Sequence, residues 1–441
     1  MTYGESLGYL ESLQRFGIKL GLDNIRTVLE SLGQPHRDYP SVHIAGTNGK
    51  GSVAAMLAEI LSAHGFRTGL YTSPHLVRLE ERIRIDGRLI SPKGVARGLT
   101  ILKKSIDSLL AAGALVYPPT FFEVVTALAL TYFAEQGVDI AVLEVGMGGR
   151  FDATNAVTPI VSVITTIAHD HQKYLGRTLG EIAFEKAGII KPGVPVVCGV
   201  RSGGALRVIR RRAREEGAPI IEVFGRGSAF APAAAGGNRF RYDSGSDVYT
   251  FKPSLLGAHQ GENAAVALRA AETISRVWRP LDARTSVRAV SRTRWEGRLE
   301  IVRRRPAVIL DGAHNPEGAA ALGAYIRDSV RKPVVLVFDA MKDKDIRKIA
   351  RTLFPRARRI ILTRVPMDRA ASPQEVLDLC REYADRIILE PDIRRALDRA
   401  LSEAGARTPV VVAGSLFLVG AIKKILGGKP FAAPLPGLPR H

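Results

Sequence analysis

Cysteine is nearly absent: the 441 residues contain only Cys198 and Cys380, both within or beside apolar runs. Two isolated cysteines exclude a disulfide-based secreted scaffold, so we expect buried free thiols and a reducing compartment, the cytoplasm. The chain also lacks an apolar run of about eighteen residues, the length that spans a bilayer, so we expect no membrane segment. Residues 1–20 carry glutamates and have no apolar core of the signal-peptide type.

Acidic residues are fewer than basic ones: the chain has 43 Asp and Glu and 63 Lys and Arg, which gives a net charge of +20. A strongly basic protein can bind nucleic acid. Here the arginines are scattered, few aromatics accompany them, and the sequence contains no nucleic-acid-binding motif. We therefore expect a solvated basic surface that attracts anionic substrates. A nucleic-acid-binding ATPase is the alternative, which salt-sensitive RNA binding would support.

A glycine-rich stretch organises the rest of the chain. An apolar strand over 42–45 leads into residues 46–52, which hold three glycines, a lysine and a serine, and a helix follows over 52–63. This arrangement predicts a site for a nucleotide triphosphate, because backbone N–H groups and the helix N-terminus would face the phosphates, and a simple Gly/Asn turn between a strand and a helix is the alternative. The spacing departs from the common G-x-x-x-x-G-K-[ST] pattern, since Gly51 separates Lys50 from Ser52.

Polar side chains follow four of the other predicted strands. Strands over 68–71, 140–143, 160–166 and 307–310 are followed by Thr72-Ser73-Pro74-His75, Glu144, His169-Asp170-His171 and Asp311-Gly312-Ala313-His314. A parallel sheet presents functional groups at the carboxyl ends of its strands. Glu144, near a phosphate loop, suits a magnesium ligand, although a glutamate that merely begins a loop is the alternative. The two histidines and the aspartate are candidates for catalysis or metal binding.

The alternation of strands and helices predicts an α/β protein with two sheets. Residues 1–296 would form an N-terminal P-loop-type ATPase domain with a mostly parallel sheet, and residues 297–427 a C-terminal Rossmann-like α/β domain. The proline- and glycine-rich residues 428–441 are expected to be disordered. Three segments of the first domain look irregular: a mobile loop over 78–88, a loop and β-hairpin over 223–250, and an arginine-rich linker over 281–297.

Six motifs occur in order along the chain: residues 45–52 (AGTNGKGS), 72–75 (TSPH), 143–150 (LEVGMGGR), 152–155 (DATN), 185–189 (EKAGI) and 311–316 (DGAHNP). Together they resemble the folylpolyglutamate synthase/dihydrofolate synthase family of the Mur ligase superfamily. The resemblance runs from the glycine loop to Leu416, and the unusual spacing of the phosphate loop is the family's own variant.

The resemblance implies an ATP-dependent amide ligase. ATP phosphorylates a carboxylate on the pterin substrate, dihydropteroate or a folate (poly)glutamate, and the amine of L-glutamate displaces phosphate from the acyl phosphate. It further implies ATP and Mg²⁺, two ions, a monomeric protein, and no nucleic-acid or membrane partner. Two domains contributing to one site imply closure around the substrates. A peptidoglycan-precursor ligase is the nearest alternative, but the loop begins at Gly46 and leaves no room for a separate uridine-nucleotide domain.

The resemblance also implies roles for individual residues. The phosphates would meet Asn48, Gly49, Lys50, Gly51 and Ser52, and ATP would also contact Asn263, Arg298 and Asp311. The metal ligands would be Ser73, Glu144 and His171, although histidine is an unusual ligand for Mg²⁺. The catalytic residues would be Lys50, Lys186, which the family carboxylates, and His314. The pterin substrate would meet Phe121, Phe122, Glu123, Arg150, Phe151 and Asp152.

Structural roles are the alternatives for several of these residues. Glu123 stands three residues after Thr120, the spacing of a helix capping box. Phe121 and Phe122 could be helix core, and Lys186 could be an unmodified lysine packed against its own helix.

Overall fold

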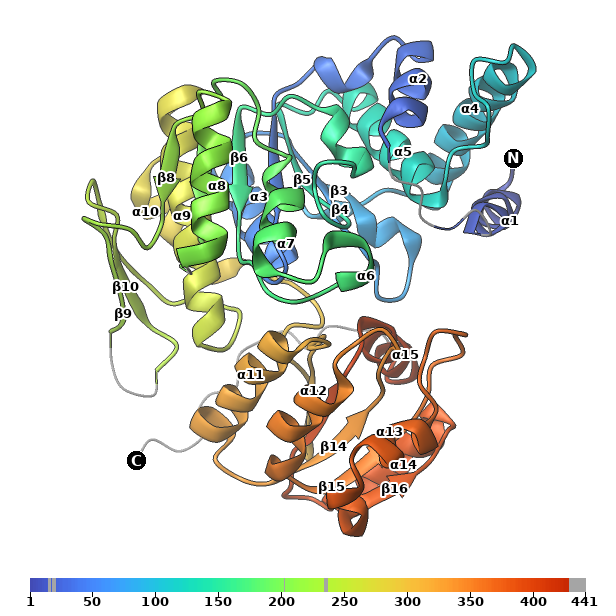
Figure 1. The fold of residues 1–441 in the computed structure, drawn as a ribbon, viewed down its shortest axis with the longest axis vertical. Coiled ribbons are helices and arrows are strands. Elements are labelled where there is room, and N and C mark those ends of the chain that lie inside the picture. Colours follow the sequence, from blue (N-terminus) through green and yellow to red (C-terminus); the bar gives the residue numbers. More distant parts are fainter. Residues whose placement is uncertain (15–16, 18–20, 202, 234–236, 428–441) are drawn as a thin grey trace.

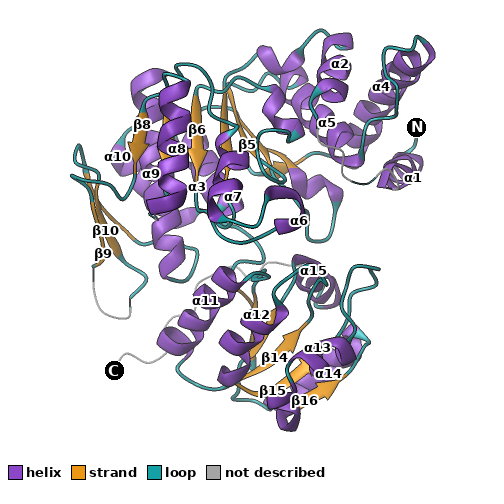
Figure 2. Cartoon of the chain, viewed as in Figure 1, coloured by secondary structure: helices purple, strands orange, loops and turns teal. Residues whose placement is uncertain are grey.

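The protein folds around two sheets that lie one above the other, each covered by helices (Figures 1 and 2). The computed structural model describes residues 1–14, 17, 21–201, 203–233 and 237–427. The α/β class predicted from the sequence is confirmed. The expected disorder of 428–441 concerns residues outside this description. Across the described residues, no helix is both long and apolar enough to cross a bilayer.

The larger sheet has the strand order β4-β3-β2-β5-β1-β6-β7-β8. It is parallel from β2 to β8, and β3 and β4 are added antiparallel at one edge. In register, Ile44 of β1 lies opposite Glu144 of β5 and Val163 of β6, which brings the ends of three strands together. The strands are β1 Ser41–Ala45, β2 Thr68–Tyr71, β3 Ile83–Ile85, β4 Arg88–Leu89, β5 Ile140–Glu144, β6 Val161–Ile164, β7 Val196–Cys198 and β8 Ile220–Glu222.

Helices cover both faces of this sheet. One face packs on α3 Lys50–Ala63, α9 Ala258–Val277 and α10 Ala283–Arg292 in a single apolar core. The other packs on α7 Leu179–Ala187 and α8 Gly203–Glu215. A further core gathers the helices at the β2 end, namely α1 Tyr3–Gln14, α2 Asp23–Ser31, α4 Pro92–Ala111 and α5 Phe121–Glu135. Both cysteines are buried and free, as expected.

A small antiparallel sheet lies at the outer side of α9, where the sequence predicted a hairpin. It has three strands, β9 Ala229–Pro232, β10 Phe240–Asp243 and β11 Val248–Phe251. Phe240 packs against Gly261 of α9 so closely that a Cβ at Gly261 would lie 2.7 Å from the ring. Glycine at this position therefore lets the added sheet approach the helix.

The second sheet has the order β12-β13-β17-β14-β15-β16 and is parallel except for β12. Its strands are β12 Glu300–Arg304, β13 Ala307–Leu310, β14 Val334–Phe338, β15 Ala357–Leu362, β16 Ile387–Leu389 and β17 Val410–Ala413. Its helices are α11 Pro316–Tyr325, α12 Ile346–Leu353, α13 Pro373–Leu379, α14 Ile393–Ala404 and α15 Leu416–Ile425. We refer to the parts before and after residue 296 as the N-terminal and C-terminal domains, a boundary that stays a prediction.

Two predictions of irregular structure were wrong. Residues 78–88 form a 3₁₀ turn, β3 and β4, because Glu81 accepts the backbone N–H groups of residues 76–78 and folds the charged segment onto the sheet. Residues 283–292 form α10, which starts at the N-cap Asp282 and buries Ala289 and Val290. The helix was not recognised from the sequence because arginines occupy its exposed face and interrupt the apolar residues of its buried face.

The connection between the domains is held from both sides. Trp295 packs on the core of the N-terminal domain, and a Cβ at Gly51 would lie 2.9 Å from its Nε1. The next residue, Glu296, accepts from Lys423 Nζ at 3.0 Å, and Lys423, only 3% exposed, also reaches Glu300 at 2.7 Å. Next to the predicted boundary, the contacts of the chain therefore pass from the N-terminal core at Trp295 to Lys423 at Glu296.

Candidate functional site

The phosphate loop between β1 and α3 depends on glycine. Gly49 is the N-cap of α3 with φ +85°, and a Cβ there would lie 2.4 Å from Asn263 Oδ1. A Cβ at Gly46 would lie 1.9 Å from Thr165 Oγ1. The backbone N–H of Asn48 donates to Thr166 Oγ1 at 3.0 Å, so the end of β6 supports the loop. The result is a rigid cradle at a helix N-terminus, the environment that binds phosphate.

Two lysines converge on this loop. Lys50 Nζ donates to the Gly46 and Thr47 carbonyls at 3.0 and 3.2 Å. Lys186 Nζ, buried beneath it on α7, donates to the Gly46 carbonyl at 2.8 Å. Burial lowers the pKa of Lys186 to about 7, and the charge of Lys50 adds to the effect. Near neutral pH the Lys186 amine is therefore only partly charged, and Lys50 supplies the positive charge at the loop.

Oxygen donors surround the start of α3. Glu144, buried at the end of β5, accepts the Ser73 backbone N–H at 3.1 Å, and burial raises its pKa although Lys50 opposes the shift. The hydroxyl of Ser52 is buried, and no group of the described residues forms a hydrogen bond with it. A buried hydroxyl normally has a partner, so its isolation marks a place for a ligand. His171 precedes α6 Gln172–Leu175 in a left-handed conformation, and burial lowers its pKa to about 4, which leaves the imidazole neutral.

The C-terminal domain forms the opposite wall. Asp311, at the end of β13, accepts the backbone N–H groups of Leu299 and Ala313 at 2.9 and 3.0 Å. Burial raises its pKa while the nearby Arg298 opposes the shift. A Cβ at Gly312 would lie 2.3 Å from Nη1 of Arg298 and 2.4 Å from the side chain of Leu416, so glycine leaves room for both side chains. Arg298 and Asp311 thus lie close together on the side of the site that faces the phosphate loop.

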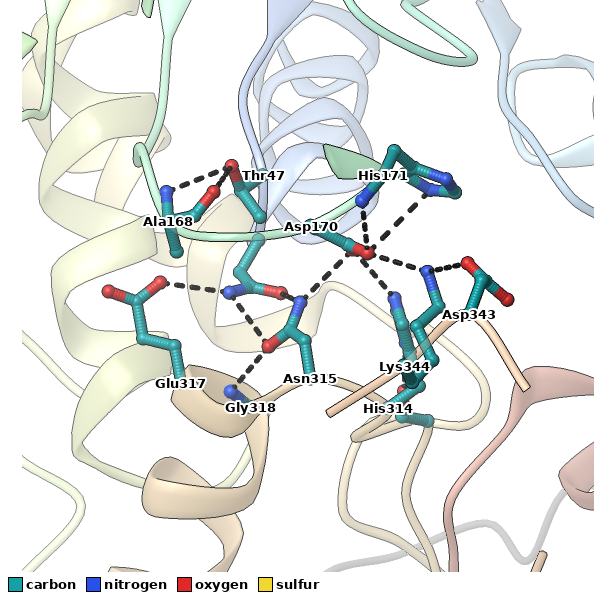
Figure 3. A network of polar contacts seen from close by, with 12 residues as sticks. Thr47, Ala168, Asp170, His171, His314, Asn315, Glu317, Gly318, Asp343 and Lys344 are labelled. Atoms are coloured by element: carbon teal, nitrogen blue, oxygen red, sulfur yellow. Dashed lines mark hydrogen bonds and ion pairs between the residues drawn. The ribbon is translucent and has the colours of Figure 1, made fainter. Parts of the chain in front are cut away.

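A cluster of polar contacts joins the domains beside the loop (Figure 3). The Asp170 carboxylate receives Lys344 Nζ at 2.5 Å, and His314 Nε2 and Asn315 Nδ2 at 3.2 Å each. We call these four residues the Asp170 cluster. Burial acts to raise the pKa of Asp170, but the His314 hydrogen bond and the neighbouring positive charges hold it well below its usual range. Asn48 extends the contacts, because its Nδ2 donates to Glu317 Oε2 at 2.9 Å.

A cavity of ≈ 380 Å³ runs between these walls. It brings together every residue assigned above to the phosphates, the nucleotide, the metal and catalysis: Asn48, Gly49, Lys50, Gly51, Ser52, Ser73, Glu144, His171, Lys186, Asn263, Arg298, Asp311 and His314. It is also lined by Phe224, His259 and Gln260, which the sequence reasoning did not single out. Gln260 accepts a hydrogen bond from Asn263 Nδ2 at 3.0 Å. The i, i+3 spacing from Asn263, a predicted nucleotide contact, could have pointed to Gln260 in the sequence.

The six residues expected to meet the pterin substrate lie outside this cavity. Arg150 pairs with Glu185 at 2.6 Å, and its guanidinium lies 4.3 Å from the centre of the Phe151 ring, which is 37% exposed. Phe121 lies under the Arg82 guanidinium at 5.3 Å. Arg82 is buried, whereas the side chain of Arg150 and the ring of Phe151 are exposed and directly follow the glycines of residues 146–149.

Three of these six residues have structural contacts. Glu123 is buried and completes the capping box of α5 with Thr120, the alternative predicted from their spacing. Asp152 accepts the backbone N–H groups of Met147 and Thr154 at 2.9 and 3.1 Å. Phe122 packs on Gly146, where a Cβ would lie 2.5 Å from the ring. Their substrate roles stay predictions.

Comparison with known proteins identifies relatives over the full chain. Family profiles match residues 118–271 as the Mur ligase middle domain and residues 297–416 as the Mur ligase glutamate ligase domain. The "Dihydrofolate synthase/folylpolyglutamate synthase" of Bacillus subtilis is 34% identical and covers 96% of this chain and 99% of its own. A probable bifunctional folylpolyglutamate synthase/dihydropteroate synthase of Haloferax volcanii is 37% identical over 95% of this chain, which spans only 50% of that protein.

Solved structures agree with these matches. Mycobacterium tuberculosis folylpolyglutamate synthase, complexed with ADP and AMPPCP, superposes with a TM-score of 0.89 at 34% identity and covers 97% of this chain and 100% of its own. An E. coli protein in complex with DHPP and ADP gives 0.86 at 28% identity, covering 97% and 98%. The names of the curated relatives and of the M. tuberculosis structure denote folate enzymes, rather than the peptidoglycan ligase or nucleic-acid-binding ATPase considered above.

Proposed function

Because the chain belongs to the folylpolyglutamate synthase/dihydrofolate synthase family of Mur ligases, it is an ATP-dependent glutamate ligase, and we propose how its residues carry out the reaction. The proposal rests on the cavity in which two lysines, a buried carboxylate and groups from both domains converge. ATP would bind with its phosphates against the N-terminus of α3. Lys50 would hold the β- and γ-phosphates, and Asn263, Arg298 and Asp311 would contact the nucleotide.

The ligation needs two displacements. A carboxylate oxygen of the pterin substrate attacks the γ-phosphorus of ATP, which releases ADP and leaves an acyl phosphate. The amine of L-glutamate then attacks the acyl carbon, loses a proton and expels phosphate, which forms the amide. Phosphoryl transfer depends mainly on positioning and on cations that stabilise charge. Lys50 supplies such a cation from the N-terminal domain, and His314 approaches from the C-terminal domain.

The donor set around α3 fits Mg²⁺. The unpartnered Ser52 hydroxyl and the buried Glu144 carboxylate are oxygen ligands of the kind that this ion prefers. We propose that Ser73, Glu144 and His171 hold Mg²⁺, with two ions present together with ATP. Bound Mg²⁺ would neutralise charge on the phosphates and the incoming carboxylate, which otherwise repel one another.

The pterin substrate, dihydropteroate or a folate, would lie on the surface beside residues 146–149, where Phe122 packs on Gly146 and Arg150 lies over the Phe151 ring. Phe121, Phe122 and Phe151 offer rings for stacking on a flat heterocycle, and Arg150 offers a positive charge. Glu123 and Asp152 would shape this surface through the turns they cap. We place the enzyme in the cytoplasm as a monomer, because ATP is available there, thiols stay reduced, and one chain supplies both walls of the site.

One assay tests the function. The purified chain, given ATP, Mg²⁺ and labelled L-glutamate, should form a labelled pterin amide with one ADP released for each amide. Dihydropteroate and tetrahydrofolate, offered separately, distinguish the dihydrofolate synthase activity from the folylpolyglutamate synthase activity. ADP release without amide formation from either acceptor would refute the proposal.

Lys186 is expected to carry a carbamate. With a pKa of about 7, its amine is largely neutral above neutral pH, and only the neutral amine attacks CO₂. The product would be an anion that orients the phosphates or the metal. In ¹³C-bicarbonate, NMR should show a carbamate signal that grows between about pH 6 and pH 8. The Lys186→Met variant should lack it.

Lys191 is the matched control, because burial also lowers its pKa, to about 8, but its Nζ donates to the Asn155 carbonyl away from the loop. The Lys191→Met variant should keep the carbamate signal. A signal that survives Lys186→Met would remove Lys186 as the modified residue.

A further inference from the structure

The Asp170 carboxylate lies between the domains with all its acceptor positions in use. Oδ1 accepts Lys344 Nζ at 2.5 Å and the His171 backbone N–H at 2.9 Å, and Oδ2 accepts His314 Nε2 and Asn315 Nδ2 at 3.2 Å (Figure 3). The side chains of Asp170 and Lys344 are only 6% and 8% exposed. A carboxylate accepts about four hydrogen bonds, so this one is saturated, and three of its donors belong to the C-terminal domain.

These three donors come from two separate strand ends. His314 and Asn315 follow β13, whereas Lys344 lies in the loop between β14 and α12. All three donors meet on one carboxylate, and a second contact comes from Asn48, whose Nδ2 donates to Glu317 Oε2 at 2.9 Å. Two such points restrict the orientation of the C-terminal domain as well as its distance. A single surface ion pair would contribute little, because exposed pairs are weak and adaptable.

The same contacts reach the phosphate loop. Asn315 Nδ2, which donates to Asp170, also lies 2.9 Å from Asn48 Oδ1 in the loop. Asn315 Oδ1 accepts the Gly318 backbone N–H at 2.8 Å and thereby caps α11. His314 Nδ1 lies 2.8 Å from the Gly312 carbonyl, so its ring is held from both nitrogens. Through these contacts, Asp170 fixes the positions of His314 and of the start of α11 relative to the phosphate loop.

We propose that Asp170 and Lys344 are positioning residues of the ligase, whose ion pair orients the C-terminal domain so that His314 and Asn315 face the phosphate loop during turnover. The inference rests on the proposed function and extends it to two residues that need not touch the reacting atoms. A buried pair has to offset the desolvation of both charges, so it adds little net stability. The Asp170–Lys344 ion pair instead contributes by holding the C-terminal domain in one orientation.

Asp170→Asn and Lys344→Met, made in the full chain, test the proposal. We expect kcat to fall about 100-fold in each, the scale of a misplacement of about 1 Å. The KM for ATP should rise by less than kcat falls, because the phosphate loop and Asn263 stay in place in the N-terminal domain and only the contacts of Arg298 and Asp311 are displaced. Lys344→Arg, which keeps the charge, should recover most of the loss. The double variant should lose no more than the worse single variant, since either change breaks the same pair.

The exposed pair Lys342–Glu375, 3.6 Å apart on the same domain, provides the control, and Glu375→Gln should leave kcat unchanged. Small-angle scattering with AMPPCP, Mg²⁺ and acceptor should show the compact form for wild type and a more extended one for Lys344→Met. A kcat within twofold of wild type in Asp170→Asn, or additive losses in the double variant, would overturn the inference. A wild type that ligates no glutamate would instead overturn the proposed function.

Discussion

Lys50→Ala should abolish ATP turnover while the fold persists. The side chain brings a positive charge to the end of the phosphate loop, and in its absence the Gly46 and Thr47 carbonyls would face the γ-phosphate uncompensated. Loss of a preorganised cation at a transferring phosphoryl group is expected to cost about 1,000-fold or more in kcat. Phosphate release with both co-substrates present, measured beside the thermal melting curve, checks both halves of the prediction.

The fold should survive because Lys50 lies in the first turn of α3 and its ammonium bonds only to the loop. Lys104→Ala, an exposed lysine on α4, is the matched control and should behave as wild type. If Lys50→Ala retained ATP turnover, Lys50 would lose its assignment to the phosphates.

Glu144→Ala should remove activity or raise the magnesium requirement sharply. Glu144 is the buried carboxylate at the end of β5, and its Oε2 also fixes the Ser73 backbone N–H at 3.1 Å. The substitution removes one oxygen ligand, the Glu144 carboxylate. It also releases the turn that carries Ser73, which is another proposed ligand. The Mg²⁺ concentration for half-maximal activity should rise about 10- to 100-fold, as when support of a metal site is lost.

Mn²⁺ binding, followed by electron paramagnetic resonance, gives a readout that does not require turnover. Glu135→Ala is the control, because Glu135 pairs with Arg97 on the surface of α5. Unchanged Mn²⁺ affinity together with unchanged Mg²⁺ dependence in Glu144→Ala would exclude Glu144 as a ligand.

The sequence predicted the strand framework well because apolar β-branched runs are local signals. β2 and β13 lie where those runs were recognised, and α5 has Thr120 as its N-cap and the predicted capping box. The carboxyl ends of the strands then placed Ser73, Glu144, His171 and Asp311 on one cavity, since parallel strands present their ends at one edge.

Other features could not be predicted from local patterns. The 78–88 segment looked like a loop because its order comes from Glu81 binding backbone groups, a contact that composition does not reveal. Lys344 reads as one charge in a run of charged residues, and only the meeting of two domains buries it against Asp170. Asp170 stood beside a recognised histidine, but no spacing rule links it to a lysine 174 residues away.

Trp295 and Glu296 are neighbours held by different domains, the first by an apolar core and the second by Lys423. The peptide unit between them is planar, so only a few backbone torsions serve as the covalent pivot of the molecule. One inserted residue at this point would leave both sheets and their cores intact. It would nevertheless offset the two halves of the site by up to about 3.8 Å, the spacing of consecutive Cα atoms. We therefore expect turnover to depend on the length of this connection as well as on the chemistry of the side chains that it brings together.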